Sequence, residues 1–231
     1  MVDPKVIVAL DYDEEKKALE FVSKVDPKLC KLKVGNELFT SAGPAFVSKL
    51  VDKGFGVFLD LKYHDIPNTV AKACTAAAKL GVWLVNVHAS GGTEMMTAAR
   101  EALEKFQNRP KLIAVTVLTS TNRIGLQAIG IDEEPRTQVL RLAKLAKECG
   151  LDGVVSSAQE ANVIKQYLGS PFFCVTPGIR PAGTALGDQK RVMTPKEAIE
   201  NGSDYLVIGR PITQATDPIA TLEEINESIK L

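Results

Sequence analysis

Short apolar runs rich in β-branched residues alternate with amphipathic segments from one end of the chain to the other. The apolar runs predict buried strands, because a strand covered on both faces shows no polar alternation. The intervening segments carry apolar residues at helical spacing and predict helices. The predicted strands lie at residues 6–10, 29–33, 55–61, 82–87, 111–117, 153–156, 172–175 and 205–208. A helix is predicted after each strand, most clearly at 13–24, 67–80, 93–106, 136–149 and 218–230, with another that ends near residue 53.

Eight strand–helix units fill the 231 residues without a glycine- or serine-rich linker. This repetition predicts an α/β fold, a single (β/α)8 TIM barrel in which residues 1–231 form one domain. The alternative is a doubly wound open sheet, which would carry Gly-x-Gly-x-x-Gly after an early strand. The segments after the first two strands, Leu-Asp-Tyr-Asp and Val-Gly-Asn-Glu, lack that motif. The barrel is therefore the preferred prediction.

The composition of the chain indicates which class of ligand the protein binds. Hydrophobic residues make up 45% of the chain, which is enough for a core, and 28 Lys and Arg balance 28 Asp and Glu. The chain thus lacks the basic excess that favours nucleic-acid or membrane binding. No apolar run approaches the roughly 20 residues that cross a bilayer, and the first residues, Met-Val-Asp-Pro-Lys, place an acid where a signal peptide is basic. We expect a cytoplasmic protein with a small-molecule ligand.

Cysteines and histidines do not predict a metal centre. The cysteines form no Cys-x-x-Cys pair, which is typical of small buried residues in a reducing compartment. The two histidines, His64 and His88, share no helix face, so hydrogen-bonding or packing roles are favoured over metal ligation. The four cysteines are Cys30, Cys74, Cys149 and Cys174.

Charged residues follow the second and third predicted strands, where a TIM barrel places its chemistry. Asp60 and Lys62 leave the third strand on the same side, because side chains alternate along a strand. Lys33 ends the neighbouring strand and Asp65 follows the end of the third. We therefore expect Lys33, Asp60, Lys62 and Asp65 to stand as alternating charges at the barrel mouth. A surface ion pair is the alternative, but it accounts poorly for charges that follow an apolar strand directly.

Such alternating charges favour the charged form of each group. A protonated Lys62 can donate a proton, whereas a Schiff-base nucleophile would need a neutral amine. A Mg²⁺ site is disfavoured as well, because Mg²⁺ prefers oxygen ligands and Lys33 stands where a third ligand would be most useful.

A second group of residues indicates a phosphate site. The segment 176–194 is an unusually long loop that carries Arg180 and Gln189, and loops of this length are usually functional. The eighth strand ends in Gly209 and Arg210. Loops after strands seven and eight commonly bind phosphate in these barrels. Glycine admits a close backbone approach, and arginine presents a fork of donors that suits phosphate.

Together these motifs resemble the orotidine 5'-phosphate decarboxylase family over essentially the whole chain. The segment 60–69, Asp-Leu-Lys-Tyr-His-Asp-Ile-Pro-Asn-Thr, is the most specific match, and the motifs at 8–11, 31–35, 116–120, 176–180 and 207–211 follow in the family's order. The resemblance implies a homodimeric barrel without a metal or organic cofactor. It also implies conversion of orotidine 5'-phosphate to uridine 5'-phosphate and CO2 in pyrimidine synthesis.

The resemblance further implies a role for each site residue. Lys62 would protonate C6 of the pyrimidine as CO2 leaves, Asp60 would lie against the substrate carboxylate, and Lys33 would bridge Asp60 and the ribose. Asp65, together with Thr69, would enter the site of the neighbouring subunit. The remaining substrate-binding residues would be Asp11 at a ribose hydroxyl, Ile66, Thr119 at the pyrimidine edge, and Arg180, Gln189, Gly209 and Arg210 at the phosphate and its lid.

Two alternatives remain. The related sugar-phosphate decarboxylases and aldolases that use Mg²⁺ share the fold and the Asp-x-Lys-x-x-Asp signature, but they carry a carboxylate where Lys33 stands. Lys33 therefore favours the orotidine 5'-phosphate branch. A catalytically inactive barrel that serves as a binding module is the other alternative, and the intact set of charges disfavours it.

Overall fold

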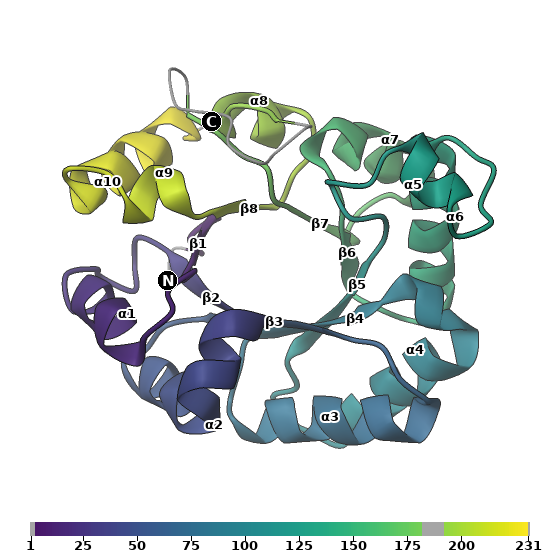
Figure 1. Cartoon of the computed structure of the whole chain (residues 1–231), viewed down its shortest axis with the longest axis horizontal. Coiled ribbons are helices and arrows are strands. Elements are labelled where there is room, and N and C mark those ends of the chain that lie inside the picture. Colours follow the sequence, from purple (N-terminus) through teal and green to yellow (C-terminus); the bar gives the residue numbers. More distant parts are fainter. Residues whose placement is uncertain (1–2, 182–191, 231) are drawn as a thin grey trace.

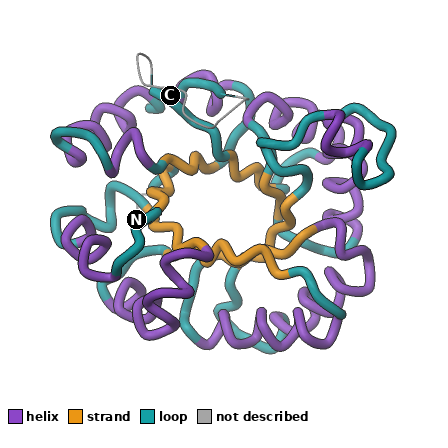
Figure 2. Tube along the Cα trace, in the orientation of Figure 1, coloured by secondary structure: helices purple, strands orange, loops and turns teal. Residues whose placement is uncertain are grey.

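Parallel strands close into a barrel within residues 3–181 and 192–230, the part of the chain that the computed structural model describes. Each strand pairs with the next, and the last pairs with the first. Figure 2 shows this ring of strands inside a ring of helices. The closed ring confirms the predicted TIM barrel and excludes the open sheet. The strands are β1 (Val6–Ala9), β2 (Lys31–Gly35), β3 (Val57–Tyr63), β4 (Leu84–His88), β5 (Lys111–Val115), β6 (Gly153–Val155), β7 (Phe173–Thr176) and β8 (Tyr205–Ile208).

Helices follow the strands and cover the outside of the barrel (Figure 1). Proline opens four of them, α3, α6, α8 and α10, because its fixed φ and missing N–H fit the first helical turn. The helices are α1 (Glu15–Val22), α2 (Asn36–Asp52), α3 (Pro67–Lys79), the 3-10 helix η1 (Ala89–Gly91), α4 (Gly92–Leu103), α5 (Arg123–Gln127), α6 (Pro135–Glu148), α7 (Ala158–Leu168), α8 (Pro195–Glu200), α9 (Arg210–Thr213) and α10 (Pro218–Ser228).

The observed strands begin and end at other residues than the apolar runs predict. β2 begins at Lys31 rather than at residue 29, and β3 runs from Val57 to Tyr63 rather than from 55 to 61. Cys30 and Phe55 are buried although they precede these strands. An apolar run reports burial, whereas a strand boundary depends on backbone partners in the neighbouring strand, so the two differ at the ends of elements.

A small second core fills the inside of the barrel, separate from the larger core between strands and helices. Phe58 belongs to this inner core, and Asp60 follows it by two residues. Because side chains alternate along a strand, Asp60 also faces the barrel axis. The inner core consists of Ile7, Ala9, Phe58, Leu84, Ile113, Val175, Tyr205 and Val207.

Lys31 closes the end of the barrel at which the strands begin. Its side chain is only 6% exposed and forms an ion pair with Asp3. Its ammonium donates to the carbonyl of Pro4 at 2.9 Å and lies 4.7 Å and 5.2 Å from the ring centres of Trp83 and Tyr205. The Tyr205 hydroxyl donates to Asp3 at 2.7 Å. Lys31 and Asp3 are thus paired with each other and with neighbouring groups of the protein at this end of the barrel.

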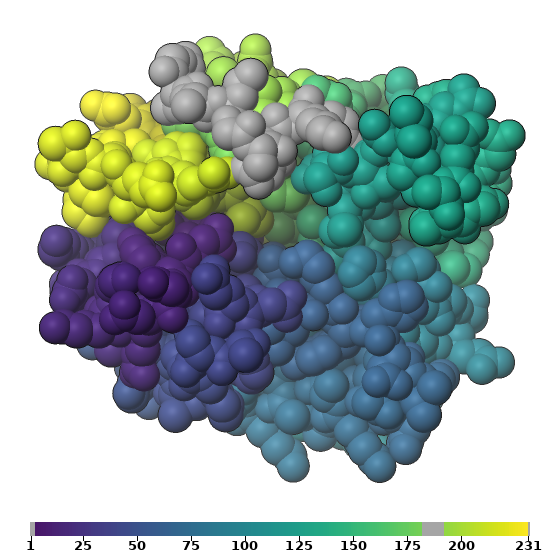
Figure 3. Space-filling view, viewed as in Figure 1, coloured from purple at the N-terminus to yellow at the C-terminus, as the bar shows by residue number. Residues whose placement is uncertain are grey.

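Closure of the barrel brings the last unit of the chain against the first. In the space-filling view the yellow C-terminal helices lie next to the purple N-terminal segments (Figure 3). β8 pairs with β1, and Asn226 of α10 donates to the carbonyl of Leu29 at 2.9 Å. Residues from both ends of the sequence therefore contribute to the same rim.

Candidate active site

Four charged side chains meet where β1, β2 and β3 end. Lys62 Nζ lies 2.8 Å from Asp60 Oδ1, and Lys33 Nζ lies 3.6 Å from Asp60 Oδ2. Lys33 Nζ also lies 3.2 Å from Asp11 Oδ1. The charges thus alternate in the order Asp11, Lys33, Asp60, Lys62, which we call the charge array. The structure brings together three of the four expected members, Lys33, Asp60 and Lys62, and the fourth carboxylate is Asp11, which contacts Lys33.

Strand register explains how the array forms. Ala9 pairs with Lys33, and Gly35 pairs with Asp60, so the ends of three neighbouring strands are level. Gly35 also leaves room for the Lys33 side chain, because a Cβ at Gly35 would lie 3.0 Å from Lys33 Nζ. The side chains of Lys33 and Asp60 are only 11% and 12% exposed. Their mutual attraction is therefore screened less than that of a surface pair.

β3 is irregular where it reaches the array. Leu59 pairs with Val85 and Tyr63 pairs with Val87, so β3 advances four residues while β4 advances two. Lys62 lies inside this bulge with φ +52°, the one positive φ outside glycine in the described residues. A bulge re-aims side chains beside an active site. Alternation of side chains along a strand therefore predicts that Lys62 contacts Asp60, but it does not predict the bulge or the positive φ of Lys62.

Asn86, which is not among the site residues expected from the sequence, joins the array to the bulge. It is fully buried in β4. Its Nδ2 donates to Asp60 Oδ1 at 2.7 Å, and its Oδ1 accepts the backbone N–H of Lys62 at 2.8 Å. The one sequence signal is an amide inside the apolar run Leu-Val-Asn-Val of residues 84–87, because a buried polar group needs a partner.

Asp65, Ile66 and Thr69 are exposed and follow the end of β3. β3 ends at Tyr63 and α3 begins at Pro67, so these residues belong to the turn and the first helical turn. The Asp65 carboxylate accepts the N–H of Ile66 at 2.6 Å, and Ile66 is 67% exposed. Asp65 does not complete the array here, because the chain has already left the barrel at that point.

A cavity of about 250 Å³ opens beside the array. Polar groups of Lys33, Asp60 and Lys62 line one side, and Thr119 lines it from the loop after β5. Much of the remaining lining is apolar, and a few convergent polar groups in an apolar pocket are typical of small-molecule sites. The apolar lining residues are Phe58, Val115, Val117, Leu118, Val155, Pro177 and Val207.

Arginines stand near the ends of β7 and β8. Arg180 is buried and its guanidinium donates to the carbonyl of Ile179 at 2.9 Å. Burial, followed by the positive charge of Arg210, lowers the pKa of Arg180, so the two guanidinium groups are electrostatic neighbours. A Cβ at Gly209 would lie 3.2 Å from Asp11, which shows how closely the backbone passes the array. Gln189 lies outside the described residues.

The two histidines lie side by side, which their sequence positions do not reveal. The ring centres of His64 and His88 are 5.5 Å apart. Burial, followed by the charges of His64 and Lys62, lowers the pKa of His88. Within residues 3–181 and 192–230, no three His, Cys, Asp or Glu side chains form a group that could hold a metal ion. All four cysteines are buried and free, as predicted.

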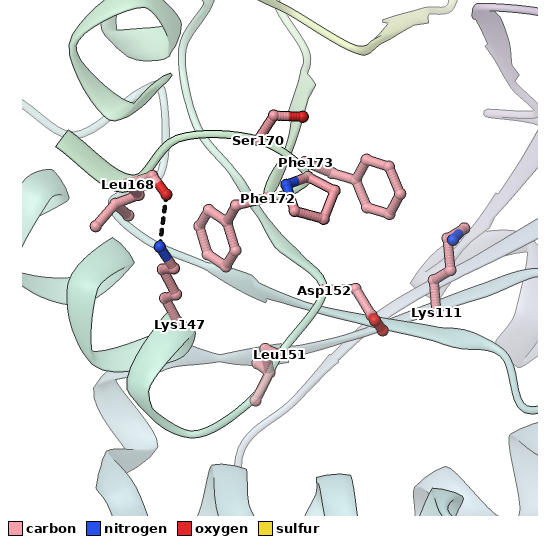
Figure 4. A pocket seen from close by; sticks show the side chains of 9 residues that line it. Lys111, Lys147, Leu151, Asp152, Leu168, Ser170, Phe172 and Phe173 are labelled. Atoms are coloured by element: carbon pink, nitrogen blue, oxygen red, sulfur yellow. Dashed lines mark hydrogen bonds between the residues drawn. The ribbon is translucent and has the colours of Figure 1, made fainter. Parts of the chain in front are cut away.

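A second cavity, of about 320 Å³, lies at the end of the barrel where the strands begin (Figure 4). Its charged side chains are engaged by the protein itself. Lys147 donates to the carbonyl of Leu168 at 2.6 Å, and the Lys111 ammonium lies 4.5 Å from the centre of the Phe173 ring. The Asp152 carboxylate accepts two hydrogen bonds from the Arg109 guanidinium. This cavity therefore lacks the converging charges of the first.

Comparison with known proteins shows the family of the chain. Residues 4–225 match the model of the orotidine 5'-phosphate decarboxylase / HUMPS family. The chain is 65% identical over 230 residues to the orotidine 5'-phosphate decarboxylase of Vibrio cholerae, covering 99% of this chain and 100% of the relative. It is 63% identical over 227 residues to that of Pseudoalteromonas translucida, covering 98% and 97%. The solved structure of orotidine 5'-phosphate decarboxylase from Lactobacillus acidophilus is 42% identical, with a TM-score of 0.89 and coverage of 99% and 100%. The chain therefore belongs to the orotidine 5'-phosphate decarboxylase family, as its motifs predict.

Proposed function

We propose that this chain converts orotidine 5'-phosphate to uridine 5'-phosphate and CO2, with Lys62 as the proton donor to C6 and without a metal or organic cofactor. Decarboxylation in pyrimidine synthesis follows from the family. The observation that carries the finer assignment is the Lys62–Asp60 contact of 2.8 Å beside the cavity. It sets an ammonium donor next to the carboxylate that would face the leaving group.

The order of groups around the rim supports a single pose for the substrate. β8, β1, β2 and β3 are successive neighbours in the barrel. A phosphate would lie at Arg180, Gly209 and Arg210, together with Gln189. The ribose would then reach Asp11 and Lys33 between β1 and β2. The pyrimidine would fill the cavity of about 250 Å³, with Thr119 at its edge.

The chemistry explains why an ammonium group is needed. Loss of CO2 from C6 leaves a carbanion whose electrons lie in the ring plane, so no ring carbonyl can delocalise them. Stabilisation must come from preoriented charge. Opposite charges about 4 Å apart attract by roughly 4 kcal/mol at an effective dielectric near 20. Lys62 therefore supplies one sizeable part of the catalysis, and phosphate binding in the closed site can supply more.

Lys33 supports the metal-independent form of the reaction. Its ammonium lies between Asp11 and Asp60, 3.2 Å and 3.6 Å from their oxygens. The Lys33 ammonium thus bridges two carboxylates at the position where a Mg²⁺ enzyme would place a metal ligand. The matching family model is named for both orotidine 5'-phosphate decarboxylase and HUMPS. A chelation experiment therefore tests whether this chain works without a metal.

The test is CO2 release from orotidine 5'-phosphate by the purified protein after exhaustive chelation with EDTA. The proposal expects the same rate with and without chelator, and no gain on addition of Mg²⁺. A loss of activity that Mg²⁺ restores would move the chain to the metal-dependent branch. No release of CO2 under either condition would refute the proposed reaction.

The proposal includes a homodimer in the cytoplasm, in which Asp65 and Thr69 complete the site of the partner subunit. The exposure of both side chains at the rim supports this role, since neither is used within its own chain's array. Within the part of the chain that is described, no helix is long and apolar enough to cross a bilayer.

A further inference from the structure

We infer that Asn86 is a positioning residue of this active site, whose side-chain amide holds the β3 bulge so that Asp60 and Lys62 face the same point. The inference deepens the proposed function and rests on it for the role of Lys62. Asn86 lies in β4 between Val85 and Val87, the two residues that pair with β3 on either side of the bulge.

The bulge leaves the backbone of Lys62 out of the regular ladder. The ladder pairs Leu59 with Val85 and resumes only at Tyr63 with Val87. The N–H of Lys62 bonds to the Asn86 side chain at 2.8 Å instead of to a strand carbonyl. A positive φ at a non-glycine residue is unfavourable and persists only where its surroundings hold it. Asn86 supplies that restraint at Lys62 itself.

One amide group serves both charged residues. Its oxygen accepts from Lys62 N–H while its nitrogen donates to Asp60 Oδ1 at 2.7 Å. Asp60 Oδ1 therefore receives Asn86 Nδ2 and Lys62 Nζ together, and Oδ2 is left toward Lys33. Only a side chain with a donor and an acceptor can make both bonds. Because Asn86 is fully buried, solvent cannot readily replace either partner.

Asn86 acts through its two partners rather than on the substrate. It does not line the cavity beside the array, whereas Asp60 and Lys62 do. Loss of the amide should therefore disturb the geometry of the reacting groups more than substrate binding. The expected signature is a fall in kcat with little change in KM.

The test uses Asn86→Asp as the main variant. Aspartate keeps the size of asparagine and the acceptor for Lys62 N–H, but it sets a carboxylate against that of Asp60. We expect kcat to fall at least about 100-fold and KM for orotidine 5'-phosphate to change less than about threefold. Asn86→Ala, which removes both bonds, should show the same split.

Asp152→Ala is the matched control. Asp152 also accepts a strand backbone N–H through its side chain, from Leu112 at 2.7 Å, but at the opposite end of the barrel. This variant should lower the melting temperature while kcat stays within about twofold of wild type. The control shows how much kcat changes when a side-chain bond to a strand N–H is lost away from the array.

The outcomes distinguish this inference from the proposed function. A folded Asn86→Asp protein with a kcat near wild type would overturn the positioning role. So would an Asn86→Asp protein whose kcat falls no further than that of Asp152→Ala when both variants lose the same amount of melting temperature. Failure of both Asn86 variants to fold, with Asp152→Ala folded, would assign Asn86 to stability and overturn it too. Lys62→Ala is measured in parallel, because activity in that variant would refute the proton donor whatever Asn86 does.

Discussion

Lys62 bonds at 2.8 Å to Asp60, which precedes it by two residues in the same strand, through a backbone bulge that an ordinary strand would not contain. The positive φ of Lys62 and the amide of Asn86 are part of the same arrangement. Proximity in sequence alone therefore does not bring the ammonium and the carboxylate together. A strained backbone and a neighbouring strand hold them in place.

Replacement of Lys62 by alanine should abolish turnover and leave the fold intact. The side chain is 30% exposed at the rim and contributes little to the core. Loss of a general acid costs about 100-fold or more in rate, and kcat is the quantity to measure. Lys17→Ala, an exposed lysine on α1, serves as the control and should keep wild-type activity. Retention of even about a tenth of wild-type kcat by folded Lys62→Ala would show that another group donates the proton.

Replacement of Arg210 by alanine should raise KM for orotidine 5'-phosphate roughly 10- to 100-fold, because a charge-assisted hydrogen bond to phosphate is lost. The effect on orotidine, which lacks the phosphate, should be much smaller. Steady-state kinetics on both substrates measure the difference. Arg141→Ala removes an exposed arginine from α6 and should change neither KM. Equal damage to both substrates would place Arg210 away from the phosphate.

Inactive Lys62→Ala and inactive Asp65→Ala chains should restore activity when their subunits exchange. If Asp65 completes the partner's site, as proposed, one site of a heterodimer collects both lesions and the other has neither. Random pairing would then recover up to about one quarter of wild-type activity if the sites act independently. Exchange is verified with differently tagged chains. Verified exchange without recovery would mean that Asp65 serves its own subunit.

His88 should make the stability of the fold depend on pH. Burial, followed by the charges of His64 and Lys62, lowers its pKa from 6.5. Below pH 6.5 the unfolded chain binds a proton at this residue that the folded chain does not. The stabilising contribution is therefore present above pH 6.5 and is lost as the pH falls from 6.5 toward the folded pKa.

The comparison of wild type with His88→Gln isolates this contribution. Melting temperatures measured from about pH 8 to pH 5.5 should show wild type losing stability relative to the variant only in the acidic part of the range. A constant difference between the two proteins across the whole range would contradict the prediction.

The sequence by itself predicts the barrel, the order of its strands and three of the four residues of the charge array. Apolar runs and helical periodicity report which residues are buried in which kind of element, and eight repeated units have few ways to close. Asp60 and Lys62 lie two residues apart and Lys33 lies in the neighbouring strand, so alternation and strand order predict that the three charges lie close together, although not the bulge that holds Lys62 in place.

Only the tertiary structure places Asp11 on Lys33, Asn86 between Asp60 and Lys62, and His64 beside His88. Each of these contacts joins different strands or a strand and a loop, and depends on the register between them and on one bulge in β3. Periodicity along a single segment carries the direction of a side chain but not the partner that it meets across the barrel. Asp11 and Asn86 therefore cannot be assigned to the array from the sequence, because their contacts depend on how the strands pair.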